Sequence, residues 1–122
     1  MKNTMSETEF YILKYLWTRE TPATFAEIMT HFSEEGKEWK KQTVNTFLTR
    51  LSAKGFVNID KSGKKAIYTP TVNLKEFYEN YAKEVVDESY NGSILEFIRA
   101  YSAGHKLDEA EKSELASFIQ NF

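Results

Sequence analysis

The sequence predicts a mostly α-helical fold that carries one small β-hairpin. Three observations predict it: repeated helix-capping signals, apolar residues spaced three to four apart after those signals, and one pair of alternating segments around a glycine turn. Of the 122 residues, 41% are hydrophobic and 15% are aromatic, so the chain has enough apolar side chains to bury a core. This length suits one compact unit, with room for a small appendage.

Three helices are expected in the first half of the chain. The first begins at the capping box Ser6-x-x-Glu9, and the second begins at Thr24-x-x-Glu27. The third runs from about Lys41 to Lys54, and Gly55 ends it. The apolar faces of these helices are formed by Phe10, Leu13, Leu16 and Trp17, by Phe25, Ile28, Met29 and Phe32, and by Val44, Phe47, Leu48 and Leu51.

A β-hairpin is expected after the third helix. The segments FVNID and KAIYTP alternate apolar and polar residues on the two sides of Lys61-Ser62-Gly63-Lys64, where glycine suits a turn. Three helices followed by a hairpin are typical of a winged helix-turn-helix. We therefore predict a winged helix-turn-helix domain over residues 1–71.

Residues 72–122 are expected to form three more helices and to pair two copies of the chain. The helices open at Asn73-x-x-Glu76, Ser93-x-x-Glu96 and Asp108-x-x-Glu111. Their apolar side chains are too many for short helices in water, so burial against a second copy is the simplest interpretation. We predict a homodimer joined by this helical dimerisation domain. The residues expected at the interface are Tyr81, Val85, Ile94, Leu95, Ile98, Tyr101, Leu115, Phe118, Ile119 and Phe122.

The net charge of −2 hides an uneven distribution of charge along the chain. Residues 37–65 contain eight Lys or Arg against two Asp or Glu, whereas the segments on both sides are acidic. A local cationic block in an acidic chain predicts one surface that faces a polyanion.

The outer face of the third helix has the chemistry of DNA recognition. If its apolar residues face inward, amides, hydroxyls and an arginine face outward, and such groups pair with base edges and phosphates. Lysines precede this helix and also lie in the hairpin turn, where a wing adds backbone contacts. The expected DNA-binding residues are Lys40, Lys41, Gln42, Thr43, Asn45, Thr46, Thr49, Arg50, Lys54, Lys61, Lys64 and Lys65.

Other kinds of site have little support in the sequence. The chain has no cysteine, which excludes disulfides, thiolate zinc sites and a cysteine nucleophile, and which suits a reducing cytoplasm. It has no signal-peptide core and no apolar run as long as a membrane span, so we expect a cytoplasmic protein without membrane contact. His31 and His105 have no carboxylate pair at metal-ligand spacing. We predict no enzyme, no catalytic residue, no metal and no cofactor.

Two alternatives to DNA recognition remain open at this point. In one, the polar face of the third helix is an ordinary solvated surface. In the other, the fold is a winged-helix protein–protein interaction module without direct DNA binding. Such a module would carry an exposed apolar stripe where a DNA-binding protein carries cations.

The segment 38–55, with Thr-x-x-Thr-x-x-Thr-Arg-Leu at residues 43–51, resembles the recognition helix of the penicillinase-repressor (BlaI/MecI/CopY) family. The opening residues 6–10, followed by Leu16-Trp17, are similar to the first helix of that family, and residues 92–115 resemble its dimerisation helices. The resemblance implies a dimeric transcriptional repressor that binds double-stranded operator DNA through its winged domain.

The chain departs from this family at positions that are linked to release from DNA. The members that respond to β-lactams, which this chain resembles, share an Asn-Phe bond that is cut. At the matching positions this chain has Ala100-Tyr101. Asn45 stands where the β-lactam repressors usually have a basic residue, a difference that concerns the operator sequence and not release. Copper-responsive members carry a cysteine-rich motif that this chain lacks. The inducer therefore stays open between a protease that cuts a different bond and a small molecule. The residues that could line a site for such a small molecule are Tyr78, Tyr81, Tyr90 and Tyr101.

Overall fold

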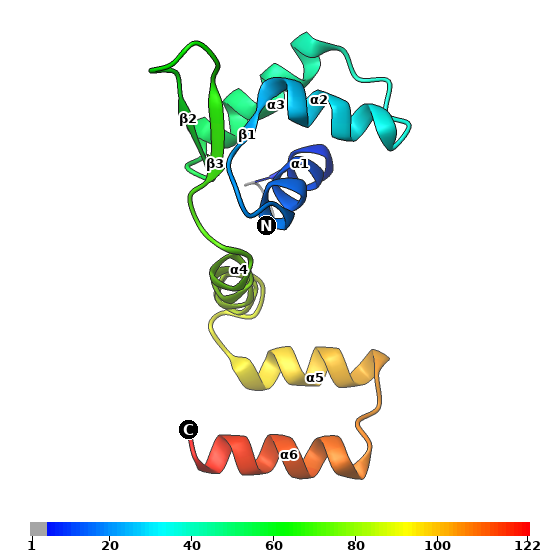
Figure 1. Cartoon of the computed structure of the whole chain (residues 1–122). Coiled ribbons are helices and arrows are strands. Elements are labelled where there is room, and N and C mark those ends of the chain that lie inside the picture. Colours follow the sequence, from blue (N-terminus) through cyan, green and yellow to red (C-terminus); the bar gives the residue numbers. More distant parts are fainter. Residues whose placement is uncertain (1–4) are drawn as a thin grey trace. The chain divides into compact units, whose positions relative to one another are not determined.

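The computed structural model describes residues 5–122, so the first four residues of the expected winged domain lie outside it. Figure 1 shows the helices and strands in chain order. They are α1 (Glu7–Thr18), β1 (Ala23–Thr24), α2 (Phe25–Glu34), α3 (Lys41–Ala53), β2 (Val57–Asp60), β3 (Ile67–Pro70), α4 (Leu74–Ser89), α5 (Ile94–Gly104) and α6 (Glu109–Gln120). The predicted fold class, mostly helical with a small antiparallel β-wing, is confirmed.

The chain divides into two compact units between Tyr81 and Ala82, which lies within α4. The first turns of α4 belong to the winged unit because Phe77 is only 5% exposed. Its ring lies 5.7 Å from the ring of Phe10 and 5.1 Å from that of Trp17. The division therefore falls inside a helix, after the loop at residue 71 where the sequence suggests a boundary. The extent of the dimerisation domain stays a prediction.

Side chains cap the helices where the sequence places capping signals. Complete capping boxes open α1 at Ser6, α2 at Thr24 and α6 at Asp108. At the start of α5, the Ser93 hydroxyl accepts a hydrogen bond from the third backbone N–H of the helix. The side chain of Asn73 does the same for α4, at 2.8 Å. Each cap satisfies an N–H group that the helix leaves unpaired, so local sequence defines where these helices begin.

The core of the winged unit is formed by the inner faces of α1, α2 and α3, together with the sheet and the start of α4. The apolar side chains that recur at helical spacing are the ones that this core buries. The buried residues are Ile12, Leu13, Leu16, Ala23, Ile28, Phe32, Val44, Leu48, Leu51, Val57, Tyr68 and Phe77.

The sheet has three antiparallel strands in the order β1-β3-β2 among the described residues. The hairpin is formed by β2 and β3, with Asp60 opposite Ile67 at the end nearest the turn. On the other edge of β3, Ala23 pairs with Tyr68. The sequence predicted the hairpin but missed β1, because two residues are too few to produce a recognisable alternation.

Gly55 joins α3 to the wing through a turn that favours glycine. Its φ of 85° lies in the left-handed region, which favours glycine. The Phe56 N–H then donates to the Leu51 carbonyl at 2.9 Å, which ends α3. The Thr71 hydroxyl donates to the Gly55 carbonyl at 2.6 Å and ties the end of the hairpin to the same turn. The position of the wing is thereby fixed relative to the end of α3.

An ion pair between a buried carboxylate and a partly exposed ammonium links the start of α1 to the end of α3. Glu9 is 2% exposed, and both of its carboxylate oxygens accept hydrogen bonds from the Lys54 ammonium at 2.9 Å. Burial raises the pKa of Glu9, but hydrogen bonds from Lys54 and Ser6 lower it by more. The Glu9 carboxylate therefore has a pKa below its ordinary value and stays charged in the folded protein.

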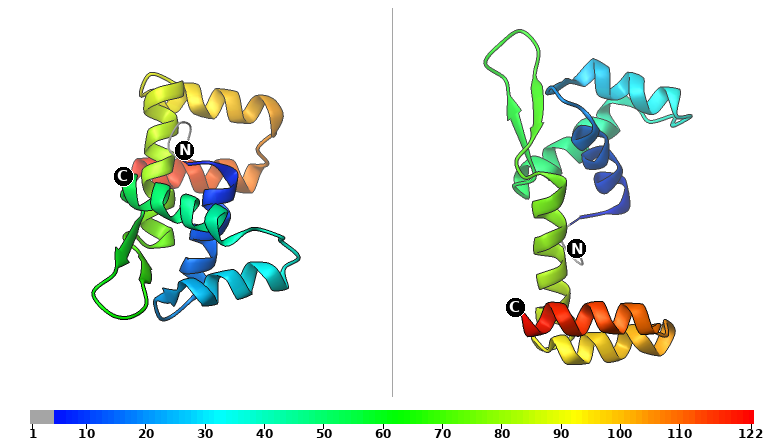
Figure 2. Two further views of the ribbon diagram at one scale, coloured as in Figure 1. Left: turned by 90° about the horizontal axis from the view of Figure 1, so that it is seen from above. Right: turned by 60° about the horizontal axis from the view of Figure 1, so that its bottom comes forward.

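The second unit, described by itself, contains the end of α4 with α5 and α6. Figures 1 and 2 show that α5 and α6 run in opposite directions. Neither helix buries a side chain. Isolated helices of this length are marginal in water, so they need a surface that covers their apolar side chains. No helix within residues 5–122 is long and apolar enough to cross a bilayer.

Replacing Glu9 with glutamine is expected to destabilise the winged unit in a pH-dependent way. The substitution keeps the size of the side chain but removes the charge opposite Lys54, which should lower the free energy of unfolding by about 1–3 kcal/mol at neutral pH. Because folding lowers the pKa of Glu9, the stabilisation is complete above its ordinary value of 4.5 and is lost as the pH falls below that value. The difference between wild type and variant should therefore shrink in acid.

Urea unfolding followed by tryptophan fluorescence measures this difference, because Trp17 and Trp39 both lie in the winged unit. Glu7→Gln is a matched control, since Glu7 is exposed in the same first turn and its carboxylate accepts a hydrogen bond from the Tyr11 hydroxyl at 3.3 Å. Equal stability of wild type and Glu9→Gln at pH 7 would contradict the expected role of the ion pair.

Candidate nucleic-acid interface

The outer face of α3 is polar and exposed over its whole length. Val44, Leu48 and Leu51 are fully buried, which turns the opposite side of the helix toward solvent. Phe47 is half-buried, and the Arg50 guanidinium lies over its ring at 5.8 Å. The predicted contact residues on this helix are all exposed, namely Lys41, Gln42, Thr43, Asn45, Thr46, Thr49 and Arg50.

The hydrogen-bonding groups on this face are nearly all available to a ligand. Within the described part of the chain, the side chains of Gln42, Thr43, Asn45 and Thr49 make no hydrogen bond. The Thr46 hydroxyl instead donates to the Gln42 carbonyl at 2.9 Å. Thr46 can therefore only accept from a ligand, whereas the amides of Gln42 and Asn45 can both donate and accept.

Cations flank this face at the start of α3 and in the wing. Lys40 is the residue that precedes the helix, and its side chain makes no capping bond. Lys61, Lys64 and Lys65 are exposed in the hairpin turn. None of these lysines forms an ion pair with any residue among 5–122, and Lys41 forms none either. Their charges are therefore not neutralised within the chain.

Lys54 stands apart from the other predicted contact residues. Its ammonium is held by Glu9, and its side chain is 33% exposed. Lys37, the remaining cation of the block, lies over the rings of Tyr11 at 5.4 Å and Trp39 at 5.8 Å. The structure thus separates the cationic block into residues with internal partners and residues without them.

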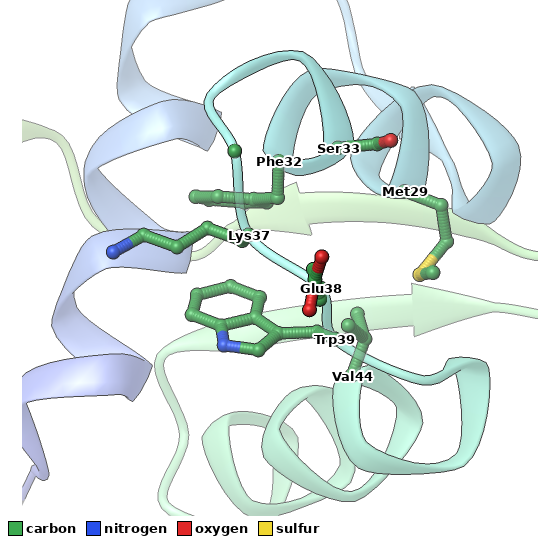
Figure 3. Close-up of a pocket in the computed structure, with 8 residues that line it drawn as sticks. Met29, Phe32, Ser33, Lys37, Glu38, Trp39 and Val44 are labelled. Carbon is green, nitrogen blue, oxygen red and sulfur yellow. The ribbon is translucent and has the colours of Figure 1, made fainter.

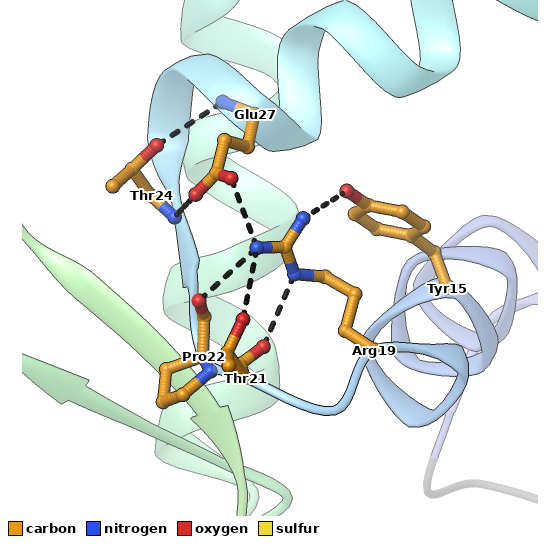
Figure 4. Close-up of polar contacts among 6 residues, drawn as sticks. All are labelled: Tyr15, Arg19, Thr21, Pro22, Thr24 and Glu27. Carbon is orange, nitrogen blue, oxygen red and sulfur yellow. Dashed lines mark hydrogen bonds and ion pairs between the residues drawn. The ribbon is translucent and has the colours of Figure 1, made fainter.

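Arg19 fixes the start of α2, and sequence reasoning did not single it out. Figure 4 shows its guanidinium between the end of α1 and the start of α2. It donates to the Tyr15 hydroxyl and to the Glu27 carboxylate, each at 2.9 Å, and to the Pro22 carbonyl at 3.3 Å. Hydrogen bonds from the Thr24 backbone and from Arg19 lower the pKa of Glu27, so this link stays ionised. No local sequence pattern predicts the role of Arg19, because only the folded chain brings its hydrogen-bond partners close to it.

A hollow between α2 and the start of α3 lies beside the aromatic residues of this region. Figure 3 shows Trp39 and Phe32 in this hollow, whose volume is about 460 Å³. The two rings lie 4.9 Å apart. Lys37 and the Glu38 carboxylate also line it. Trp39 therefore packs against Phe32 just before α3 begins, as a helix-flanking residue.

The two histidines interact with neighbouring carboxylates. His31 lies 2.7 Å from Glu35 and stacks on Tyr15 at 3.8 Å between ring centres. His105 lies 3.4 Å from Glu111. Among residues 5–122, no group of three or more His, Asp or Glu side chains is placed to hold a metal ion.

The residues predicted at the dimer interface are exposed or half-buried in the single chain. Tyr81, Val85, Ile98 and Leu115 are half-buried. The others are large exposed apolar side chains, and Phe122 is 98% exposed. These exposed residues are Ile94, Leu95, Tyr101, Phe118, Ile119 and Phe122.

Comparisons with known proteins identify the family. The family model described as penicillinase repressor matches residues 5–121. The penicillinase repressor of Bacillus licheniformis is 25% identical over 116 residues, which cover 95% of this chain and 89% of that protein. The methicillin resistance regulatory protein MecI of Staphylococcus aureus is 23% identical over 115 residues, which cover 94% of this chain and 92% of that protein.

A solved structure supports the same assignment. The solution structure of the DNA-binding domain of the repressor BlaI matches with a TM-score of 0.52 and 28% identity, and the match covers 59% of this chain and 85% of that domain. The family match extends from the first described residue to one residue past the end of α6. The chain therefore belongs to the penicillinase repressor family.

Proposed function

We propose that the protein is a sequence-specific DNA-binding transcriptional repressor that acts as a homodimer on an inverted-repeat operator. The observation that carries this proposal is the exposed polar face of α3, together with lysines of the helix start and the wing that form no ion pair within residues 5–122. The names of its relatives and of the matching BlaI domain support repression through DNA.

The polar residues on α3 suit base recognition. A recognition helix presents the side chains of its first turns to the base edges of the major groove. The amides of Gln42 and Asn45 can each pair bidentately with adenine. Thr46 suits an amino group on a base edge, because its own proton is used within the helix. We assign sequence recognition to these three residues.

The cations suit the phosphate backbone. Lys40 and Arg50 lie near the two ends of the exposed face, and Lys64 and Lys65 lie in the wing. Contacts of this kind hold the protein in register without reading sequence. Lys54 contributes less in this proposal, because two of its N–H groups already donate to Glu9.

The exposed apolar residues of α5 and α6 support a homodimer. A face with this much apolar surface marks an association site, and a second copy presents an equal face with twofold symmetry. Two recognition helices related by a twofold axis would read an inverted repeat, with half-sites about 10 bp apart or a multiple of that distance.

The alternative function is a winged-helix protein–protein interaction module. That function needs an apolar patch on the winged unit, but every exposed residue of α3 except Ala53 is polar or charged. A salt titration of duplex binding separates the two functions, because phosphate contacts make affinity fall steeply with salt. Binding to no duplex at low salt would favour the interaction module.

The release mechanism is expected to act on the C-terminal helices. Ala100 and Tyr101 lie exposed on α5. They occupy the positions where the β-lactam-responsive members that this chain resembles have an Asn-Phe bond that is cut. The chain contains no cysteine for a copper motif. We therefore propose a different trigger, either cleavage at another bond or a small ligand.

Substitutions at Lys64 and Asn45 should affect DNA binding in different ways. Lys64→Ala removes a phosphate contact, so it should weaken binding to all duplexes alike. It should also reduce the slope of log affinity against log salt concentration by about one unit per subunit. Asn45→Ala removes a base contact, so it should cost about 1–3 kcal/mol on the selected operator and relax preference at one position. Fluorescence anisotropy with the operator and with single-mismatch operators at several salt concentrations measures both effects.

The operator for these measurements comes from selection of bound sequences out of random duplex DNA by the full-length protein. Lys75→Ala serves as a control, because Lys75 is an exposed lysine on α4 that pairs with Glu79. The assignment of roles is wrong if Asn45→Ala and Lys64→Ala give the same profile across the mismatched operators.

The full-length chain should sediment as a dimer at micromolar concentration. Analytical ultracentrifugation is expected to give twice the chain mass of 14.2 kDa. Phe118→Glu and Ile119→Glu place charges on the exposed face of α6 and should shift the protein toward monomer. A strict monomer in the wild type would rule out the proposed assembly.

Truncation after Ala100 should abolish tight operator binding while the winged unit stays folded. The truncation removes Tyr101 and all of α6, so two half-site contacts are no longer linked in one molecule. Electrophoretic mobility shift measures the affinity, and tryptophan fluorescence reports whether the winged unit is intact. Full-length affinity in residues 1–100 would refute a role for the C-terminal interface.

A further inference from the structure

We propose that a cavity between α2, the start of α3 and the wing binds a small apolar molecule that carries a carboxylate, and that this ligand competes with DNA. The competition rests on the proposed function, whereas the binding site itself does not. The ligand class follows from the shape and the charge of the cavity, whose two lysines also belong to the surface assigned to DNA.

The cavity has the size and the lining of a small-molecule site. Its volume is about 490 Å³, within the range of roughly 300–1,000 Å³ that is common for ligand pockets. Phe25, Ala26 and Met29 of α2 form one side, and Ala66 of the wing forms another. Phe25 and Met29 are half-buried, so both offer apolar surface that a ligand would cover. An aromatic or aliphatic body suits these walls.

Two lysines from different elements give the cavity its charge. Lys41 is the first residue of α3, and Lys65 precedes β3 in the wing. Both line the cavity, both are exposed, and neither forms an ion pair within residues 5–122. No Asp or Glu is among the described residues that line this cavity. An apolar lining with two unneutralised cations selects an apolar anion.

Two other hollows of the winged unit, compared within residues 5–122, do not have this combination. The hollow in Figure 3 contains Lys37, but this lysine lies over the rings of Tyr11 and Trp39, and the Glu38 carboxylate lines the same hollow. The hollow between α1 and α2 contains lysines together with the Glu35 carboxylate. Carboxylates in both places disfavour an anionic ligand.

A ligand in the cavity would interfere with DNA at two positions. Lys41 and Lys65 belong to the recognition helix and to the wing, which are the two elements assigned to the duplex. A carboxylate held by both lysines cancels one of their two positive charges and occupies their N–H groups, and its apolar body occupies the space between the elements. A ligand that binds only the DNA-free protein lowers the population available to the operator. The site therefore suits an inducer.

The binding test uses 1-naphthoate, with 1-naphthalenemethanol as an uncharged analogue, and full-length protein without DNA. Isothermal titration is expected to give one naphthoate per chain and at least about ten-fold weaker binding of the alcohol, equal to about 1.4 kcal/mol. Lys41→Met and Lys65→Met should each weaken naphthoate about five-fold. Ala26→Trp, which fills the cavity from an exposed position, should abolish binding.

The matched control is Lys61→Met, a wing lysine that does not line the cavity and should leave naphthoate binding unchanged. Circular dichroism of every variant checks that the helices remain. Equal affinity for naphthoate and the alcohol, or equal losses in Lys61→Met and Lys65→Met, would overturn the site.

The competition test adds naphthoate to the complex of the full-length protein with its selected operator. The apparent Kd for DNA should rise with naphthoate and not with the alcohol. Naphthoate binding that depends on both lysines but leaves the Kd for DNA unchanged would overturn the competition. Lysine-dependent naphthoate binding by a protein that binds no duplex would support the site and refute the proposed function.

Discussion

The rotation of α3 about its own axis is the constraint on which the rest of the winged unit depends. Val44, Leu48 and Leu51 are completely buried, and they occupy one side of the helix at steps of four and three residues. Any other rotation would bury amides or hydroxyls without partners, at a cost of roughly 1–3 kcal/mol for each group. The same contacts that stabilise the core therefore decide which side chains reach a ligand. Glu9 and Arg19 then hold the neighbouring helix ends in place around α3.

Local features of the sequence were sufficient to predict the helices, the hairpin and the exposed face of α3. Capping signals and apolar spacing act within a few residues, so they are readable without a fold. The strand β1, the Arg19 contacts and the Glu9–Lys54 pair were not predictable in this way. Glu9 and Lys54 lie 45 residues apart, and only the packing of α1 on α3 brings them together. Long-range polar contacts of this kind leave no local pattern.

The count of basic residues in the sequence overstates the charge that the folded chain offers to a polyanion. Residues 37–65 contain eight Lys or Arg, but the Glu9 carboxylate neutralises Lys54, and aromatic rings hold Lys37. The lysines that remain without partners gather at the start of α3 and in the hairpin turn. Their positions, rather than the total charge, distinguish a surface for DNA from a general cationic face, since only cations on one side of the fold can act on one duplex.

The absence of buried side chains from α5 and α6 links the lifetime of the chain to its abundance. Helices of 11 and 12 residues without a covering surface open frequently in water, and proteases cut open backbone. For the proposed homodimer, this means that a newly made copy without a partner would be degraded faster than an assembled one. A higher rate of synthesis would raise the concentration of the chain, favour assembly by mass action and prolong the lifetime of each copy. A lower rate of synthesis would leave more copies unassembled and accelerate their degradation. The amount of such a protein in a cell would respond to changes in its synthesis more than proportionally.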